Sequence, residues 1–325
     1  IAQWLVGSEM CIRDRLGERQ YKSEIRAHLA SKKKGKWFER SISPLLTVLA
    51  SISVLTTIGI VFTLLKEAYH FFQETSVWDF ITGIEWTPFF ASDPKYGIWA
   101  LVSGTFTITV IAILFAAPIG LAIAIYLSEY ASDKVRRILK PILEILAGIP
   151  TIVYGYFALT FVTPLLQEVF PELSRFNALS PGLVLGVMII PSIASLSEDA
   201  MTAVPQAIRQ GAYALGATRL EAAIQVVLPA ALSGIVASMV LAVSRAIGET
   251  MIVTVAGGSS PNFGFHPMES VQTMTAYIVQ VSTGDAGYGS TLYYSIYAVG
   301  FMLFLFTFVM NIFSRYISRK FREEY

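Results

Sequence analysis

The chain has 325 residues, of which 54% are hydrophobic and 14% are charged, and its formal net charge is +1. A soluble domain carries about 25% charged residues, so this composition favours a lipid-embedded protein and excludes a disordered chain. The near-neutral charge gives no support for nucleic-acid binding, and the single cysteine, Cys11, excludes an internal disulfide framework.

Residues 1–40 form a basic tail with ten Lys and Arg residues. The cluster at 32–36 either binds anionic lipid or orients the first span, and we favour the second interpretation. The segment from Val6 to Arg15 resembles translated sequencing-adapter text, and the chain starts at Ile1 rather than Met. We therefore expect residues 1 to about 20 not to be native, and we assign no function to them.

Six stretches without Asp, Glu, Lys, Arg or His follow the tail, and a helix needs about 20 residues to cross the hydrocarbon core. They are residues 41–65, 96–128, 145–167, 176–197, 222–244 and 286–314. Membrane-spanning strands would be about 10 residues long and would alternate in polarity. The sequence therefore predicts an all-α, polytopic bundle of six transmembrane helices over residues 41–320.

The Lys and Arg residues are distributed unevenly between the predicted loops. Twenty of the 24 lie in residues 1–40, 129–140, 198–225 and the tail after 314. The loops on the opposite side hold only Lys66, Lys95 and Arg175. By the positive-inside rule, both termini are predicted to face the cytoplasm.

Three ionisable residues are predicted to lie within the spans: Glu144, Arg245 and Glu249. Burying such a group costs at least a few kcal/mol, so by default it marks a pathway or a pair. Arg245 and Glu249 are four residues apart, and on one helix they could bond each other. Either the pair merely neutralises itself, or it is switchable and Arg245 receives a passing oxyanion. Glu144 lies either in the pathway or at the inner membrane interface.

The sequence lacks the common motifs for nucleotide binding, nucleophilic catalysis and metal binding. It has no Gly-x-x-x-x-Gly-Lys-Ser/Thr loop and no Gly-x-Ser-x-Gly elbow, and its three histidines lack metal-ligand spacing. We therefore predict no catalytic residue, no metal site and no cofactor.

Residues 205–229 predict two short helices that meet at a glycine. Apolar positions 204, 208, 212 and 215 follow helical spacing, Gly216 breaks the helix, and a second helix continues to Pro229. Such a segment is either a compact docking surface for a cytoplasmic partner or a plain linker.

The same segment resembles the EAA loop of ABC importer permeases. That pattern is Glu-Ala-Ala, three residues, Gly, nine residues, an aliphatic residue, any residue, and Leu-Pro. The chain supplies Gln210-Gly211-Ala212, Gly216, Val226 and Leu228-Pro229 at this spacing. Gln210 and Gly211 depart from the pattern, which affects the expected polar contacts but not the docking role. Glu221-Ala222-Ala223 has the wrong offset.

Four further segments resemble the phosphate ABC transporter permeases, and specifically their PstC-type subunit. They lie at 96–98 with 104–105, at 144–155, at 189–191 and at 245–251. Thr151 stands where the family usually has Ser. Met251, directly after Gly-Glu-Thr, favours the PstC-type subunit over its PstA-type sister.

The resemblance implies a MetI-like, type I importer bundle in the plasma (inner) membrane of a bacterium or archaeon. It implies a high-affinity phosphate importer whose two permease subunits, one of PstA type, form the pore. Separate ATP-binding subunits would dock on the EAA loops, and a phosphate-binding protein would deliver the anion from outside. The chain itself would not be an enzyme. The resemblance also assigns phosphate translocation to Arg245 and Glu249.

Several alternatives stay open. The chain could serve another oxyanion, such as molybdate or sulfate, or it could be the PstA-type subunit. It could instead be a self-sufficient channel or ion-coupled transporter, or a membrane-bound sensor or scaffold. The outer residues 66–98 either touch the binding protein or form an interfacial aromatic belt with Trp78, Trp86, Pro88, Phe89 and Phe90.

Overall fold

The computed structural model describes residues 36–90 and 93–320. This part of the chain contains helices and one isolated β-bridge, between Trp86 and Tyr96, and no strand. The adapter-like segment, and nearly all of the basic tail and of its cluster at 32–36, lie outside the described residues. The predicted all-α class is confirmed.

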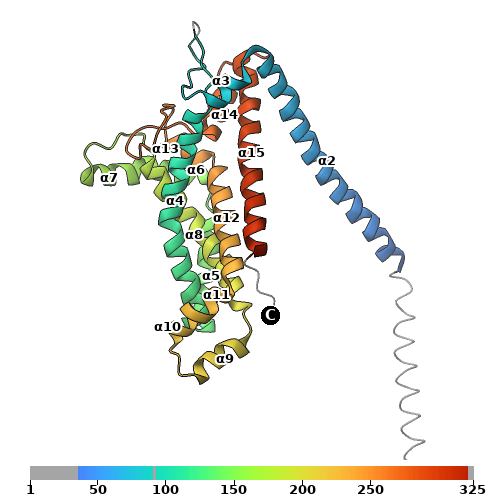
Figure 1. Cartoon of the computed structure of the whole chain (residues 1–325), viewed down its shortest axis with the longest axis vertical. Helices are drawn as coiled ribbons and strands as arrows, with labels where there is room; N and C mark the ends of the chain where they lie inside the picture. The colour runs from blue at the N-terminus through green and yellow to red at the C-terminus, as the bar shows by residue number, and fades with distance from the viewer. Residues whose placement is uncertain (1–35, 91–92, 321–325) are drawn as a thin grey trace, which may run out of the picture. The chain divides into compact units, whose positions relative to one another are not determined.

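The helical elements are labelled in chain order in Figure 1. The first group is α2 (Lys36–Glu74), α3 (Val77–Thr82), α4 (Trp99–Ile125), the π-helix η2 (Tyr126–Tyr130), α5 (Asp133–Gly148), α6 (Thr151–Phe157), the π-helix η3 (Ala158–Val162), α7 (Thr163–Val169) and α8 (Leu179–Thr202). The second group is α9 (Gln206–Ala214), α10 (Arg219–Ala222), the π-helix η4 (Ala223–Val227), α11 (Leu228–Ala230), α12 (Leu232–Ile247), α13 (Met251–Ala256), α14 (Met274–Thr283) and α15 (Thr291–Lys320).

Five uninterrupted helical segments of the described chain are long and apolar enough to cross a membrane. They are Ile42–Glu74, Trp99–Tyr130, Thr151–Val169, Leu179–Thr202 and Thr291–Ser314. A pair of helices, Arg219–Ala230 and Leu232–Ile247, adds a sixth crossing if it is counted as one span, and it is bent by 73°. The six predicted spans correspond to these five segments and the bent pair.

The third span begins later than predicted. Residues 145–148 belong to α5, and the chain breaks at Ile149-Pro150 before the crossing helix begins at Thr151. Proline has no backbone N–H and disfavours helical geometry in the residue before it. Ile149 accordingly has extended backbone angles, with φ −64° and ψ 131°. The predicted start at Ile145 was wrong because the pattern of missing charges does not register this break.

The chain divides into two units, Ile1–Thr63 and Leu64–Tyr325. In the first unit, the described side chains belong to the N-terminal part of α2, and nearly all of them are exposed. Leu46, Leu55 and Phe62 are each more than half exposed. A helix that is apolar on all sides suits a surrounding of lipid or of other apolar helices.

In the second unit, α8 packs between α4 and α12, and α15 packs on α12. Gly186 allows α8 to approach α4 closely, because an added Cβ would lie 2.8 Å from Phe115 Cδ1 and 3.0 Å from the Ala112 oxygen. Small residues at helix interfaces are typical of membrane bundles. This packing makes α8 the central helix against which the neighbouring elements are positioned.

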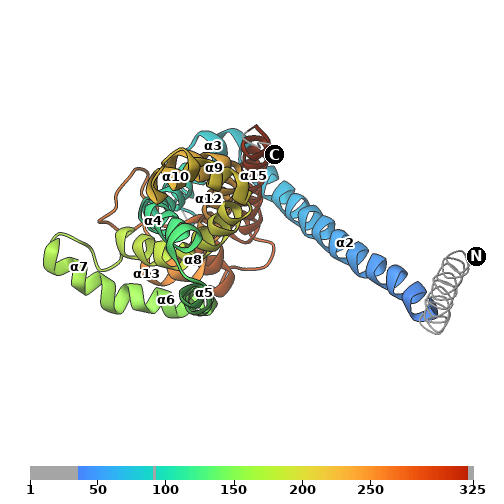
Figure 2. The ribbon, with the colours of Figure 1, turned by 90° about the horizontal axis from the view of Figure 1, so that it is seen from below.

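The helices α9 and α10 lie at one end of the second unit, and α3 and α14 lie at the opposite end (Figure 1). α7 lies away from the other helices of this unit in both views (Figures 1 and 2). The two ends are therefore formed by different parts of the sequence. Residues 205–229, the predicted docking segment, lie at the α9 end.

The α3 end is built around a cluster of aromatic rings. Trp86 makes edge-to-face contacts with Phe80, Tyr96 and Tyr277, and it is 1% exposed. Pro88 is also buried. Trp86 and Pro88 therefore form part of the core, and their predicted place in an outer contact surface or aromatic belt was wrong. Trp78, Phe89 and Phe90 are exposed, and the choice between the two roles still applies to them.

Candidate functional site

Arg245 lies in the last turn of α12, and its side chain is exposed. Its Nη1 atom donates a hydrogen bond of 3.1 Å to the Oγ atom of Ser192 on α8. A cation near the C-terminus of a helix interacts favourably with the partial negative charge there. The neighbouring helix and the helix end therefore hold the guanidinium group while leaving part of it accessible.

Glu249 does not share a helix face with Arg245. α12 ends at Ile247, so Glu249 lies in the short connection before α13. Its Oε1 atom accepts hydrogen bonds from the backbone N–H groups of Met251 and Ile252, at 3.1 and 3.4 Å. Within the described residues, no ion pair joins it to Arg245. The predicted pairing, and with it the self-neutralising alternative, was wrong because the helix ends between the two residues.

The carboxylate of Glu249 instead stabilises the start of α13. The residue is 9% exposed, and its backbone oxygen accepts a hydrogen bond of 2.7 Å from Thr275 Oγ1. The first N–H groups of a helix have no partner within the helix, so a carboxylate there is stabilising. Glu249 thus stabilises the connection between α12, which carries Arg245, and α13.

Beside Ser192 lies a cavity of about 320 Å³. Its polar lining comes from Lys140 and Glu144 on α5 and from Ser192 and Ser195 on α8. Glu144 is exposed. Ser192 therefore contacts Arg245 and also lines the cavity that contains Glu144, so the structure brings Glu144 and Arg245 to one neighbourhood.

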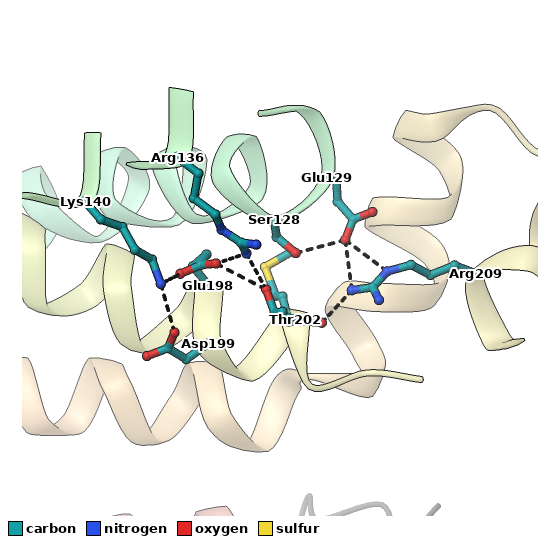
Figure 3. Close-up of polar contacts among 9 residues, drawn as sticks. Ser128, Glu129, Arg136, Lys140, Glu198, Asp199, Thr202 and Arg209 are labelled. Atoms are coloured by element: carbon teal, nitrogen blue, oxygen red, sulfur yellow. Dashed lines mark hydrogen bonds and ion pairs between the residues drawn. The ribbon is translucent and has the colours of Figure 1, made fainter. Parts of the chain in front are cut away.

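Glu198 is a buried carboxylate that the sequence interpretation missed. Its side chain is 1% exposed and forms ion pairs with Arg136 and Lys140 of α5 (Figure 3). Arg136 also donates to Thr202 Oγ1 at 2.8 Å, and Lys140 pairs with Asp199 at 3.2 Å. The hydrogen bond to Glu198 raises the pKa of Lys140 above its ordinary value.

The fourth helix therefore extends beyond the predicted span. The predicted fourth span stopped at Ser197, whereas α8 continues to Thr202 and includes Glu198 and Asp199. A signal was present, because Arg136 and Lys140 are four residues apart and share one face of a helix. A pair of cations on one helix face calls for an anionic partner nearby.

A second buried ion pair, between Arg209 of α9 and Glu129 of η2, joins the predicted docking segment to the bundle (Figure 3). Their side chains are 7% and 4% exposed. Nε and Nη2 of Arg209 lie 3.3 and 3.2 Å from Glu129 Oε1. Nη1 donates to the Val204 oxygen at 2.8 Å, and Nη2 donates to the Met201 oxygen at 2.7 Å. The sequence interpretation counted Arg209 only as a loop cation.

The remaining residues of the docking segment lie where the EAA spacing places them around a glycine turn. Gln210 and Gly211 are exposed on α9, and Ala212 is half-buried. Gly216 has a positive φ of 90°, a conformation that side chains rarely adopt, and it ends the first helix as predicted. Leu215, immediately before it, is 91% exposed. This face of α9 is open, and a Cβ added at Gly211 would meet nothing within 4 Å.

The second half of the segment is tied to the bundle. Leu228 and Pro229 lie in α11, and the adjacent Val227 is fully buried in a cluster that includes Met201 of α8 and Ile235 of α12. α10 begins with a capping box between Thr218 and Glu221, which gives Glu221 a local structural role.

Residues 116–323 match the family model described as "binding-protein-dependent transport system inner membrane component". The chain belongs to this family. The match includes α5, the docking segment, Arg245 and Glu249, and this inner membrane component is therefore a multi-pass membrane protein.

Relatives of this inner membrane component carry names that agree with the motifs. It is 35% identical over 242 residues to the probable ABC transporter permease protein YqgH of Bacillus subtilis, covering 74% of this chain and 78% of the relative. It is 34% identical over 259 residues to the phosphate transport system permease protein PstC of Mesorhizobium japonicum, covering 73% and 77% of the two chains. The second relative confirms the resemblance to PstC-type permeases.

A solved structure of a bacterial ABC transporter involved in the import of alginate shares the fold. The TM-score is 0.62 at 16% sequence identity, and the match covers 88% of this chain and 99% of that chain. The predicted fold, the bundle of an ABC importer permease, is confirmed.

Proposed function

We propose that the chain is a permease subunit of an ATP-driven importer of inorganic phosphate and forms half of its translocation pore. The relatives named as phosphate transport permeases, which match about three quarters of the chain, support the choice of phosphate. Within the site, the accessible guanidinium of Arg245 is the observation that carries the proposal.

Arg245 suits a tetrahedral oxyanion because its planar group offers several donors and can bind two oxygens at once. One donor is occupied by Ser192, and no carboxylate neutralises the group within the described residues. Glu249 fixes the end of α12 behind it through its bonds to the start of α13. In this role Glu249 positions the arginine and does not contact the anion.

The cavity beside Ser192 provides a path away from Arg245. Ser192 and Ser195 offer two hydroxyl groups along it, Lys140 is already paired with Glu198 and Asp199, and the Glu144 carboxylate repels an anion. Weak and divided attraction is what a pathway needs, because an anion that binds too tightly is not released. Glu144 therefore favours release of the anion from the cavity over tight binding.

The exposed face of α9 fits docking of a separate ATP-binding subunit. Leu215 is almost fully exposed, and Gln210 and Gly211 lie on the same open helix. A partner that covers this face would explain an exposed leucine at the end of the bundle that the positive-inside rule assigns to the cytoplasm. The chain itself would then hydrolyse no ATP.

The remaining partners follow from the same assignment. A second permease of PstA type would complete the pore, and a phosphate-binding protein would deliver the anion at the α3 end. Closure of the ATP-binding subunits would move the segment 205–229, open the bundle outward and expose Arg245 to phosphate. Release inward would follow ATP hydrolysis, with lipid around the outer helices.

Uptake of radiolabelled phosphate tests the proposal. The chain is reconstituted in proteoliposomes with its second permease, its ATP-binding subunits and its binding protein. We expect uptake that requires ATP, that unlabelled phosphate and arsenate suppress, and that sulfate and molybdate leave unchanged. Stronger suppression by molybdate or sulfate would identify another oxyanion. Uptake without ATP would contradict the importer mechanism.

A further inference from the structure

We propose that Arg209 and Glu129 are positioning residues that transmit movement of the docking segment to the helices around Arg245. The proposal rests on the proposed function, because it concerns the coupling of ATP hydrolysis to transport. It assigns a role to an ion pair that lies outside the translocation site and outside the exposed docking face of α9.

A single side chain of α9 holds three elements together. Arg209 bonds the Glu129 carboxylate at the end of the α4–η2 span, and it bonds the oxygens of Met201 and Val204 at the end of α8. The Met201 oxygen also accepts the backbone N–H of Val204 at 3.2 Å, so the arginine adds a second bond to this oxygen. α9 therefore cannot shift against α4 or α8 without breaking several charge-assisted bonds.

A series of polar contacts, with one step along the chain, continues from the Arg209–Glu129 ion pair toward the cavity beside Ser192. Thr202 follows Met201 and accepts a hydrogen bond from Arg136, which also pairs with Glu198. Glu198 pairs with Lys140 one turn further along α5. The side chains run from α9 to α5 across the end of α8 (Figure 3).

The last part of the route passes through the cavity. Lys140 and Ser192 both line it, and Ser192 accepts the hydrogen bond from Arg245. Every step from Arg209 to Arg245 is thus a direct bond, a neighbour in the chain or a shared cavity wall. A network of this kind can carry energetic coupling between two sites.

Stability alone does not account for an ion pair at this position. A buried ion pair often stabilises a fold no more than apolar residues of similar size would. Apolar side chains already anchor the region, since Val204, Met201 and Val227 form one buried cluster against which Ile208 of α9 packs. An arginine with four directed bonds adds a defined orientation of α9, which is the property that transmission of movement requires.

The test compares three variants in the reconstituted transporter: Arg209→Gln, Arg209→Lys and Glu129→Gln. The measured quantities are the phosphate taken up per ATP hydrolysed and the amount of ATP-binding subunit that co-purifies. For Arg209→Gln we expect co-purification and hydrolysis to persist while uptake per ATP falls about tenfold. Glu129→Gln keeps an acceptor oxygen, so its ratio should fall only a few-fold, and Arg209→Lys should lie between the two.

Arg137→Gln serves as the matched control, because Arg137 is an exposed cation of α5 near the same end of the bundle. Its uptake per ATP should equal that of the unmodified transporter. A wild-type ratio in Arg209→Gln would overturn the proposal. Loss of co-purification with an unchanged ratio in the remaining complexes would also overturn it, since Arg209 would then serve docking.

Failed assembly of a variant and failure of the proposed function can both be distinguished from failure of the coupling proposal. If Arg209→Gln does not assemble, Glu129→Gln decides, and an unchanged ratio in that variant overturns the proposal. If the unmodified transporter takes up no phosphate with ATP, the proposed function fails. The uptake per ATP hydrolysed is then measured with the anion that the transporter does take up, which tests the role of the Arg209–Glu129 ion pair separately.

Discussion

Arg245 carries a positive charge that, within the described part of the chain, is bonded only to a serine. Replacing it by glutamine removes the charge and leaves a shorter polar side chain. A hydrogen bond to a charged group contributes about 1.5–3 kcal/mol, so we expect Arg245→Gln to reduce phosphate uptake by about 100-fold. The measurement is initial uptake rate in proteoliposomes.

Arg245→Lys is the matched control for charge. It keeps the cation but loses the planar fork, and we expect it to retain a weak uptake with a raised KM. Both variants should assemble normally, because Arg245 makes no ion pair with any residue of the described ranges 36–90 and 93–320. Undiminished uptake in Arg245→Gln, with normal assembly, would contradict its role in translocation.

Ser192 orients the guanidinium, and its removal tests that role separately. In Ser192→Ala the arginine keeps its charge but loses its bonded partner on α8. One such bond contributes about 1 kcal/mol, so we expect the KM for phosphate to rise about fivefold with little change in the maximal rate.

Ser195→Ala is the comparison for this variant. Ser195 lines the same cavity but makes no bond to Arg245. Its KM should change less than that of Ser192→Ala. Equal changes in the two variants would show that the serines act through the cavity and not through the arginine.

For single residues, the sequence predicted that Arg245 is important but did not predict which residues it contacts. Arg245 stands out because a lone cation in an uncharged stretch is costly and therefore meaningful. Its relation to Glu249 could not be predicted, since spacing of four residues implies contact only on a continuous helix. The end of α12 at Ile247, before Gly248, removes that condition.

Between elements, Glu198 holds α5 against α8. In Glu198→Gln the two cations Arg136 and Lys140 lose their buried counter-charge. We expect a loss of about 2 kcal/mol in stability, visible as a fall of several degrees in the Tm of the detergent-solubilised protein.

Asp199→Asn is the matched control for this loss. Asp199 is the next residue, pairs with the same lysine and is 61% exposed. A solvent-exposed ion pair contributes about 0–1 kcal/mol, so its Tm should hardly move. A similar fall in both variants would contradict the central place of Glu198.

The open face of α9 allows a direct test of docking. Gly211→Trp adds a large side chain where the chain itself leaves space, so the fold should tolerate it. If an ATP-binding subunit covers this face, the tryptophan obstructs it, and we expect co-purification of that subunit to fall at least several-fold.

Gly287→Trp is the matched control, because a Cβ added at Gly287 would also meet no atom within 4 Å. Gly287 lies after α14, at the opposite end of the second unit from α9. It should leave co-purification unchanged. Normal co-purification of Gly211→Trp would show that the partner docks elsewhere.

The helices themselves were predictable to the extent that hydropathy defines them. Stretches without charge coincide with the crossing helices, but their ends do not. Ile149-Pro150 breaks the third span, and α8 continues past Ser197 because Glu198 finds two cations on another helix. The pairing joins distant segments, so its signal in the sequence was not at Glu198 but in the spacing of Arg136 and Lys140, four residues apart on one helix.

For the whole molecule, the positive-inside rule predicts which end faces the cytoplasm, and labelling can test it. Leu215 and Tyr288 are 91% and 88% exposed; Leu215 lies in the predicted loop 198–225, and Tyr288 lies in the connection between α14 and α15. In a Cys11→Ser background, we expect Leu215→Cys to react with an impermeant maleimide only after the membrane is opened, and Tyr288→Cys to react in intact cells. The reverse pattern would contradict the predicted orientation.

The 73° bend at Ala231 makes the segment from Arg219 to Ile247 a lever with two arms. Ala231 lies 12 residues from Arg219 and 14 residues from Arg245, which at 1.5 Å per residue gives arms of about 18 and 21 Å. A rotation of about 10° about the bend would then displace Arg245 by about 4 Å, more than the length of its hydrogen bond to Ser192. Because α12 packs on α8 and α15, a push on α10 that detached the arginine from Ser192 would also have to shift α12 against these two helices.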